Sequence, residues 1–555
     1  MDYMSFASYK SISQRMKMYE MQNLHRSSDS YDAIVVGAGH NGLVTANYLA
    51  RKGMSVLVLE KRDVVGGACT TEHPWPDYPE VKSSTASYVC SMLDPRIISE
   101  LNLAKYGFKF LKKDPQSFTP LLDGGHLFLY SDPEATKREI ARFSKKDAET
   151  YEEYNKFIAN IGATLESTLK QSPPDMNVRS LLKYGIKNRQ VFKNALPMAG
   201  DVASMFSMSV QDLLDRWFES ETLKASLATD GFVGTKAAPS TPGTAYVLLH
   251  HVIGGTAGGS WGYIEGGMGA ISFALQSSLE EYGRMNGVRV KVLTNSPVDH
   301  IIVENGAVRG VATIDGNEYK ARIVVSNADP KVTFLSLMNQ NELPEEFRKK
   351  VLDFRMSSSS YKLNLLLNGL PNFTAYPNRG NSPGPQHGGS VYIGSDTYEM
   401  MERAFDEVKY GRASSEPIVS LTIPSAVDRT LAPEGMYVAG CFVHHAPLEL
   451  RGTTWEEEKS KFENRIISRI EQYAPNIRDI IVATHGLSPL DLQNEFSLTG
   501  GNIFHGELSL DQVFSFRFGY TTPINGLYLC GSGTHPGGGV SGLPGLNAAK
   551  EILRH

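Results

Sequence analysis

The sequence is poor in cysteine, and the few cysteines that it has are not spaced as pairs. Its 555 residues include four, Cys69, Cys90, Cys441 and Cys530. No two of them form a C-x-x-C motif or half of a zinc site, and we predict no metal site. A disulfide-stabilised scaffold is excluded, and so is a closely spaced pair for thiol–disulfide exchange. The scarcity of cysteine favours a reducing compartment.

Long hydrophobic runs and a strong charge imbalance are also missing. No stretch of about 18 consecutive apolar residues occurs, so we predict no transmembrane helix, although a peripheral membrane contact stays open. The densest apolar stretch, residues 245–255, is short and contains His250 and His251. The net charge of −5 argues against a nucleic-acid-binding protein, which would have a basic surface and a high pI. A chain of 555 residues is long enough for two or more domains.

The first 29 residues differ in composition from the rest. They are rich in serine and methionine, and they carry four basic residues against three acidic ones. A mitochondrial transit peptide is basic, rich in serine and poor in acids, and this segment matches that description only in part. A disordered extension is the alternative interpretation.

A glycine motif follows the first apolar run. Residues 33–37 read AIVVG, which is typical of a buried parallel strand. Gly37, Gly39 and Gly42 then form G-x-G-x-x-G. Gly37 permits a sharp turn, Gly39 lets a pyrophosphate approach the backbone, and Gly42 lets the next helix pack closely on the sheet. That helix, expected over residues 41–53, points its N–H groups at the phosphates, so the motif predicts a dinucleotide site.

An acidic residue ends the second predicted strand. Glu60 lies near the position at which an acid binds the ribose hydroxyls of a dinucleotide. The chain continues through Arg62 to the pair Gly66–Gly67, which in two-domain flavoproteins brings the backbone close to the cofactor. We therefore predict FAD rather than NAD and include Arg62, Gly66 and Gly67 among the FAD-binding residues. An ordinary loop is the alternative for the glycine pair.

The C-terminal segment repeats the order of strand, glycine loop and helix. Residues 526–533 are an apolar strand that ends in a glycine turn, residues 534–545 are dense in glycine, and residues 546–553 are helical in pattern. A second backbone loop before a helix suits a flavin ring, which accepts charge on reduction. A flexible tail would not place these parts in this order. The predicted flavin-binding glycines of this segment are Gly531, Gly533, Gly538 and Gly539.

Six separated stretches resemble the phytoene desaturase-like flavoprotein family, within the wider superfamily of amine oxidases and GDP-dissociation inhibitors. They occur in the family's order, and the resemblance covers nearly all of residues 30–555. They read YDAIVVGAGHNGLVTANYLARKG (31–53), KSSTASYVCSMLDPRII (82–98), DPQSFTPL (114–121), GGSWGYIEGGMGAIS (258–272), VVSNADP (324–330) and GSGTHPGGGVSGLPG (531–545).

The resemblance implies an α/β fold, with a Rossmann-type FAD-binding domain of the amine-oxidase (GR2) type and a discontinuous α+β substrate domain. Val298, on an inserted group of strands, would lie near the adenine. The resemblance also implies a small-molecule substrate and, through animal members of the family, a location in the mitochondrial matrix. The FAD domain would combine residues 30–105, 262–335 and 480–555, and the substrate domain would combine residues 106–261 and 336–479.

Histidines are the candidate bases for a hydride transfer in which a proton must also leave. His40 lies in the pyrophosphate loop, and we interpret it as cofactor packing. His250 and His251 are expected at the cavity wall, and His535 lies in the flavin loop. A hydrogen-bonded structural role is the alternative for each of them, so we assign no catalytic residue.

An apolar helical stretch over residues 194–218 has two interpretations. It could form a substrate lid or a membrane-facing patch, but a stripe that faces the core is the more usual role of such a helix face. The apolar residues concerned are Met198, Met205, Phe206, Met208, Leu213, Leu214, Trp217 and Phe218.

We expect an FAD-dependent oxidoreductase that acts on a small or apolar substrate. Two alternatives stay open. One is a flavin-dependent isomerase, in which no net redox change occurs. The other is a non-catalytic protein that binds partners, as the GDP-dissociation inhibitors do on the same fold. Glu60 and the intact second glycine loop favour a bound flavin.

Overall fold

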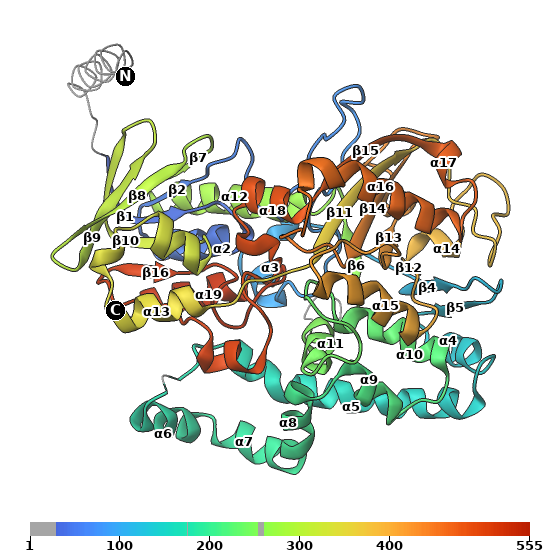
Figure 1. The fold of residues 1–555 in the computed structure, drawn as a ribbon. Helices are drawn as coiled ribbons and strands as arrows, with labels where there is room; N and C mark the ends of the chain where they lie inside the picture. Colours follow the sequence, from blue (N-terminus) through green and yellow to red (C-terminus); the bar gives the residue numbers. More distant parts are fainter. Residues whose placement is uncertain (1–28, 175, 254–259, 555) are drawn as a thin grey trace, which may run out of the picture.

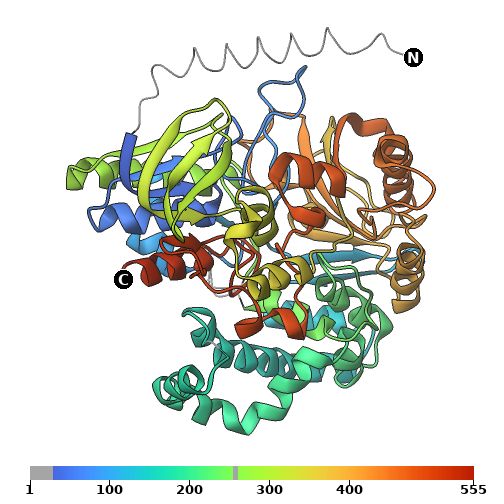
Figure 2. The same ribbon diagram turned by 60° about the vertical axis from the view of Figure 1, so that its left-hand side comes forward.

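The computed structural model describes residues 29–174, 176–253 and 260–554. Two sheets lie side by side, and a layer of helices lies beneath them (Figure 1). The arrangement is also visible after a rotation about the vertical axis, which brings the first sheet forward (Figure 2). Residues 1–28 of the expected N-terminal extension lie outside the described residues.

The first sheet brings both ends of the described chain together. Its strand order is β7-β2-β1-β10-β9-β8, with β16 beside β10. β1 pairs in parallel with β2 and β10, while β8, β9 and β10 form an antiparallel group. The strands are β1 (Asp29–Val36), β2 (Val56–Leu59), β7 (Val290–Leu293), β8 (Val298–Glu304), β9 (Ala307–Thr313), β10 (Glu318–Ser326) and β16 (Leu527–Leu529).

Helices cover this sheet closely, which explains its continuous apolar strands. All four residues of β2 are buried, as expected for a parallel strand with both faces covered. One face packs on α2 (His40–Arg51), α12 (Gly269–Asn286) and α19 (Leu543–Ile552). A Cβ atom added to Gly545 would lie 2.2 Å from the carbonyl oxygen of Asn41, so α19 approaches α2 as closely as it does because this residue is glycine.

The second sheet has the order β15-β11-β14-β13-β12-β4-β5. Its two faces differ in character, because successive side chains of a strand point to opposite sides. One face joins α16 in an apolar cluster that contains Leu363, Val443 and Phe462. The strands are β4 (Ser117–Pro120), β5 (His126–Leu129), β11 (Ser360–Leu367), β12 (Ser390–Ile393), β13 (Val419–Thr422), β14 (Tyr437–His444) and β15 (Ile481–Leu487).

A helical layer closes the lower side of the molecule (Figure 1). Met205, Leu213, Leu214 and Phe218 are buried in its core, which confirms that the apolar stretch 194–218 is mainly a core-facing stripe. The helices of this layer are α4 (Pro133–Ile140), α5 (Lys145–Leu169), α6 (Val178–Lys187), α7 (Arg189–Ala195), α8 (Ala199–Ser207), α9 (Val210–Asp215), α10 (Glu221–Ala228) and α11 (Thr244–Val252).

The remaining elements connect or cover the sheets. A short pair of strands, β3 and β6, lies between them. Among the described helices, none is both long and apolar enough to cross a membrane. These elements are β3 (Phe110–Lys112), β6 (Gly262–Ile264), α3 (Pro95–Glu100), α13 (Glu345–Asp353), α14 (Pro385–Gly388), α15 (Tyr398–Lys409), α16 (Trp455–Glu471), α17 (Ile477–Ile480) and α18 (Pro489–Phe496).

Two segments lie on the other side of the expected domain division. β15 falls inside the expected FAD segment 480–555, yet it pairs with β11 of the second sheet. Residues 343–356 fall inside the expected substrate segment 336–479, yet Val351 and Phe354 join the core under the first sheet. Both segments lie next to points at which the chain passes from one sheet to the other. The composition of the sequence does not change at these points.

Candidate functional site

A cleft of about 330 Å³ opens at the carboxyl ends of β1 and β2. This is the edge at which parallel α/β sheets bind dinucleotides. Residues that are distant in sequence meet on its wall, because the inserted strand β8 begins beside the end of β2. The residues predicted from sequence that line it are Gly37, Gly39, Glu60, Arg62, Gly66, Gly67 and Val298.

The glycine motif leaves the floor of this cleft without side chains. Gly37 has φ +94°, which favours glycine. A Cβ atom on Gly39 would fall 2.5 Å from Nδ2 of Asn327. Gly42 does not line the cleft, and its added Cβ would lie 2.3 Å from the carbonyl oxygen of Gly37. Gly42 therefore preserves the turn itself.

The N-terminus of α2 points at the cleft without a cap. No side chain caps Gly39 at the N-cap position, and the first turn contains no acidic residue. Asn41 is buried and its Oδ1 has no partner within the described structure. Backbone N–H groups and a positive dipole end at an uncapped helix terminus form a site suited to an anion such as pyrophosphate.

Glu60 and Arg62 form one side of the cleft. Glu60 is 5% exposed, and its carboxylate accepts from the backbone N–H of Ala38 at 2.8 Å and of Arg62 at 3.0 Å. The Arg62 guanidinium pairs with Glu72 and lies 4.6 Å from the centre of the Phe496 ring. Glu60 thus joins the glycine turn to the following loop and still faces the cleft. Val298, with Pro297 and Ile314, adds an apolar wall suited to a flat ring.

The C-terminal glycine loop contacts the first loop through Ser532. The Asn41 side-chain N–H donates to Oγ of Ser532 at 3.0 Å. Gly539 lines the neighbouring cavity, whereas Gly531, Gly533 and Gly538 do not line either space. Added Cβ atoms at these three positions would lie 2.3–2.5 Å from other groups, on Asn327, Pro330 and Phe504 respectively. FAD contact at the predicted glycines stays a prediction, and three of them visibly serve close packing.

Arg517 fixes this loop, although no sequence motif marks it. Its side chain is 1% exposed, and its guanidinium donates to the carbonyl oxygens of Phe504 at 2.7 Å and Ser532 at 2.9 Å. A further bond of 3.2 Å reaches the carbonyl of Thr534. Burial lowers the pKa of Arg517 to about 10, so it stays charged at neutral pH. This residue joins segments 504–507 and 532–534.

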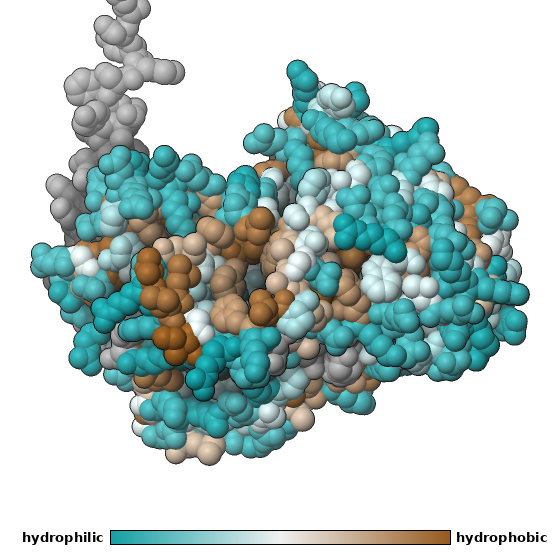
Figure 3. All heavy atoms as spheres, turned by 90° about the horizontal axis from the view of Figure 1, so that it is seen from below, coloured by the Kyte–Doolittle hydropathy of each residue, from teal (hydrophilic) through white to brown (hydrophobic). Residues whose placement is uncertain are grey.

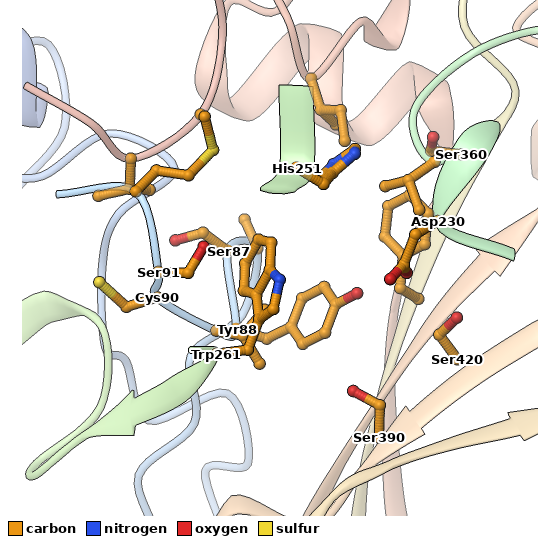
Figure 4. Close-up of a pocket in the computed structure, with 18 of the residues that line it drawn as sticks. Ser87, Tyr88, Cys90, Ser91, Asp230, His251, Trp261, Ser360, Ser390 and Ser420 are labelled. Carbon is orange, nitrogen blue, oxygen red and sulfur yellow. The ribbon is translucent and has the colours of Figure 1, made fainter. Parts of the chain in front are cut away.

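A second cavity of about 330 Å³ adjoins the cleft. It lies between the two sheets and the helical layer, and Figure 4 shows part of its wall. The two spaces share wall residues from both glycine loops and from the loops after α18, so they adjoin each other. The shared residues are His40, Ala68, Leu498, His505 and Ser532.

The candidate histidines are buried and mostly serve structure. His250 lies behind the cavity, where its Nε2–H donates to the carbonyl of Gly538 at 2.7 Å. His535 donates to the carbonyl of Thr168 at 3.1 Å. His251 does line the cavity, and its Nδ1–H donates to the carbonyl of Val247 at 2.8 Å within α11.

His40 and His505 line both spaces, and the sequence did not single out His505. Burial lowers the pKa of each to about 4, so both are neutral at pH 7. Nε2 of His40 has no partner among the described groups. Its position in the wall of the site agrees with the interpretation as cofactor packing, and no histidine stands out as a base.

Cys69 and Cys90 both line the cavity, although 21 residues separate them in the sequence. None of the four cysteines forms a disulfide bond within the described structure, and all four are buried. Burial raises the pKa of Cys69 to about 12, so its thiol is protonated at neutral pH. Only the thiolate is a nucleophile in disulfide exchange, and the buried surroundings of Cys69 do not favour the thiolate.

Comparisons with known proteins agree with this geometry. The model of the NAD(P)-binding Rossmann-like domain matches residues 35–92. Mouse pyridine nucleotide-disulfide oxidoreductase domain-containing protein 2 is 40% identical over 559 residues, which cover 95% of this chain and 94% of the mouse protein. The lycopene-forming phytoene desaturase of Pantoea ananas is 26% identical, over 92% of this chain and 96% of that protein. A solved mutant of putrescine oxidase shares the fold, with TM-score 0.58, 14% identity and coverage of 95% and 100%.

Proposed function

The chain belongs to the phytoene desaturase-like oxidoreductase family, together with the mouse pyridine nucleotide-disulfide oxidoreductase domain-containing protein 2, and from this premise we propose that it is an FAD-dependent oxidoreductase. Its substrate would be a small molecule with an apolar body, held in the cavity between the two sheets. The name of the mouse protein refers to disulfide oxidoreductase chemistry. We do not propose that chemistry for this chain, because the cysteines of the cavity are buried thiols.

The shared wall of the cleft and the cavity carries this proposal. The cleft offers an uncapped helix N-terminus for a pyrophosphate, Glu60 for ribose hydroxyls and an apolar wall at Val298 for a base. The cavity begins where the cleft ends, at His40 and Ser532. A group that is long enough to fill the cleft would therefore present its far end to the cavity. FAD has this length and this distribution of chemistry.

Bound FAD supplies a two-electron acceptor that takes a hydride from a C–H or N–H bond. The protein's own contribution is to position the substrate and to exclude water. Tyr88, Trp261 and Phe442 line the cavity, and Figure 4 shows the first two reaching into it. Apolar rings of this kind keep a substrate's reacting bond in a dry environment. Because burial lowers the pKa of His40 and of His505 to about 4, both are weak bases at neutral pH, and neither is assigned as a base.

The colour of the purified protein tests the proposal. We expect a yellow protein that absorbs near ~450 nm and releases FAD on denaturation. Chromatography of the released flavin distinguishes FAD from FMN. A colourless protein that FAD cannot reconstitute would contradict the proposal and favour a partner-binding function. Anaerobic bleaching by a substrate separates an oxidoreductase from an isomerase, since an isomerase shows no net change of flavin redox state.

Replacing Glu60 with alanine tests the ribose end of the site. The Glu60→Ala protein should retain FAD about 10- to 100-fold less tightly, because hydroxyl groups lose a charged acceptor that contributes about 1.5–3 kcal/mol. Flavin loss during dialysis, followed by absorbance, gives the dissociation constant. Glu60→Gln keeps the shape of the side chain, and its affinity for FAD should lie between those of wild type and Glu60→Ala. Equal retention by all three proteins would show that the ribose lies elsewhere.

We also propose a mitochondrial location, which rests on the resemblance to animal members of the family. Subcellular fractionation, with the full-length chain followed by antibody, tests it. Recovery of the protein in the cytosolic fraction would contradict this location without touching the proposed chemistry.

A further inference from the structure

The face of the second sheet that borders the cavity is polar, although it is buried. Lys362 of β11 lies opposite Phe442 of β14, Phe442 lies opposite Ser420 of β13, and Ser420 lies opposite Tyr392 of β12. Directly opposite residues share a face, so these four side chains form one row across four strands. All four line the cavity and are at most 8% exposed. A sheet that is buried on both sides is normally apolar on both, so this row points to a polar ligand.

Lys362 is an ammonium group without an ionic partner. It is 3% exposed and lines the cavity, and its Nζ makes no hydrogen bond to any group in the described part of the chain. Nζ lies 4.5 Å from the centre of the Tyr88 ring, which holds it over an aromatic face. A Cβ atom on Gly440 would come within 2.4 Å of Nζ, so glycine at this position makes room for the amine. A buried cation of this kind is costly unless something neutralises it.

The other charged groups of the cavity offset each other. Lys113 is 3% exposed and its Nζ donates to Oγ of Ser390 at 2.7 Å. Asp230 accepts from the hydroxyl of Tyr392 at 3.0 Å, and its charge acts on Lys113. One positive charge, that of Lys362, is left uncompensated. Figure 4 shows the hydroxyl groups of Ser360, Ser390 and Ser420 on the strand side, with Asp230 beside them.

We propose that Lys362 and the serine hydroxyl groups on the strand side of the cavity bind the carboxylate of a substrate whose remaining part is apolar. A single uncompensated cation matches a monoanion, whereas a phosphate dianion would leave excess negative charge beside Asp230. Buried hydroxyls such as Ser420, whose Oγ is also without a partner among the described residues, can donate to the second oxygen. The aromatic and aliphatic wall of the cavity accommodates the apolar part. The substrate role of this carboxylate rests on the proposed oxidoreductase function, but its binding does not.

Calorimetric titration of the purified full-length protein with decanoate tests the site. Wild type should bind decanoate at least about tenfold more tightly than decanol or decylamine, because only the carboxylate makes charge-assisted bonds with Lys362. Lys362→Met should lose at least about tenfold of this affinity, while Lys362→Arg retains most of it. Lys291→Met, at an exposed position, serves as the matched control and should bind as wild type does.

The stability of the variant without ligand separates binding from a structural role. Burial lowers the pKa of Lys362 to about 8, below its unfolded value, so the buried charge destabilises the folded state at pH 7. Lys362→Met should therefore melt at or above the wild-type temperature, whereas loss of a structural contact would lower it. Decanoate binding that does not depend on Lys362, or a preference for decylamine, would overturn the proposal. Absorbance at about 450 nm in the same samples measures bound flavin independently. Carboxylate binding and flavin binding are therefore tested separately.

A different feature, on the outer surface, carries a second inference. Helices α6 and α7 with the turn after them expose large apolar side chains at the lower edge of the molecule (Figure 1). The view from below shows apolar side chains gathered on this face (Figure 3). Tyr184 and Asn188 are buried and hold the two helices to the body of the protein. The exposed residues, named here the α6–α7 patch, are Met176 58%, Val178 74%, Leu181 42%, Leu182 62%, Ile186 72%, Phe192 48% and Leu196 74%.

The charged residues within the segment 176–200 are all basic, and Asp175 and Asp201 stand at its two ends in the sequence. Arg179, Lys183, Lys187, Arg189 and Lys193 are exposed, and residues 176–200 contain no Asp or Glu. None of the five basic side chains forms an ion pair within the described structure. The whole chain carries a net charge of −5, so this edge opposes the overall balance. Exposed apolar residues among basic ones are typical of helices that lie in a membrane interface.

We infer that the α6–α7 patch docks onto the surface of a membrane that contains anionic phospholipids. A second copy of the chain is a poorer occupant, because a symmetric contact would place five basic residues against the same five. The apolar side chains would enter the boundary of the acyl chains, and the lysines and arginines would contact the lipid phosphates.

Vesicle flotation tests this inference with the full-length protein. Wild type should float with vesicles of phosphatidylcholine and phosphatidylglycerol, and at least about tenfold less with phosphatidylcholine alone. The double variant Leu182→Glu/Ile186→Glu should stay in the dense fraction with both, while Leu122→Glu/Met285→Glu, which alters exposed residues elsewhere, should float as wild type does. Flotation of the patch variant, or no flotation of wild type, would overturn the inference. Light scattering that shows a wild-type dimer and a monomeric patch variant would assign the surface to a second copy and overturn it as well.

Discussion

Replacing Gly39 with valine should give a protein that folds but purifies without flavin. Gly39 has φ −64° and ψ 161°, an extended conformation that valine adopts readily. The Cβ atom would meet the end of the Asn327 side chain, which can turn away. The fold therefore tolerates the change, but the branched side chain would occupy the floor of the cleft where a pyrophosphate must approach the backbone.

The ratio of flavin absorbance to protein absorbance measures this effect, and we expect it to fall more than about tenfold. Gly200→Val is the matched control, because an added side chain at this helical position meets open space. The melting temperature of both variants should stay close to that of wild type. Normal flavin content in Gly39→Val would place the pyrophosphate elsewhere. By contrast, Gly42→Val should fail to fold, because its Cβ would strike the backbone of Gly37.

Replacing Arg517 with methionine should destabilise the protein by about 3–5 kcal/mol, because several buried carbonyl groups lose their donor at about 1–3 kcal/mol each. The guanidinium bonds to Phe504, Ser532 and Thr534 are all buried. Phe504 and Ser532 also line the cavity, so flavin retention should fall together with stability. Methionine fills a similar volume, which separates lost hydrogen bonds from lost packing.

Thermal unfolding followed by intrinsic fluorescence measures the change. Arg517→Lys keeps the charge but supplies fewer donors, so its melting temperature should lie between those of Arg517→Met and wild type. Arg403→Met removes a largely exposed arginine, 75% accessible, and should leave the melting temperature almost unchanged. If Arg517→Met melts like wild type, the loop is held by its glycine packing and not by this residue.

The residues that line the cleft could be predicted from the sequence because their signal is local, and their contact with a nucleotide stays a prediction. Gly37, Gly39 and Glu60 lie within two strands and one helix, and the physics of a pyrophosphate on a helix terminus fixes their order. The expected α/β fold with a Rossmann-type sheet is confirmed by the structure and by the comparisons. Val298, which lines the cleft, could be included only through the resemblance, because β8 comes from a distant segment, and its contact with an adenine stays a prediction.

The cavity half could not be predicted, because its chemistry arises from register between distant strands. Lys362, Ser420 and Tyr392 are separated by at least 28 residues, and each looks like an ordinary strand residue in the sequence. Only the pairing of β11, β14, β13 and β12 brings them into one row. Arg517 was missed for a similar reason, since its partners are backbone carbonyls, which leave no trace in residue types.

The α6–α7 patch shows a limit of reasoning from apolar pattern alone. For the stretch 194–218 we expected mainly a core-facing stripe, with an exposed patch as the alternative; Met205 and Leu213 are buried, and the exposed apolar residues lie mainly before this stretch. Both stretches have helical periodicity, and burial depends on what packs against them. The basic residues and missing acids of residues 176–200 were the distinguishing signal.

The contact between Asn41 and Ser532 joins loops that are 491 residues apart. Ribosomes make the first loop long before the second, and β16 and α19 are the last described elements to be synthesised. A ligand that needs both loops can be retained only by a finished polypeptide. A chain truncated before Ser532 would lack this contact, and we expect it to be unable to retain such a ligand, even though the strands that border the cavity are already present.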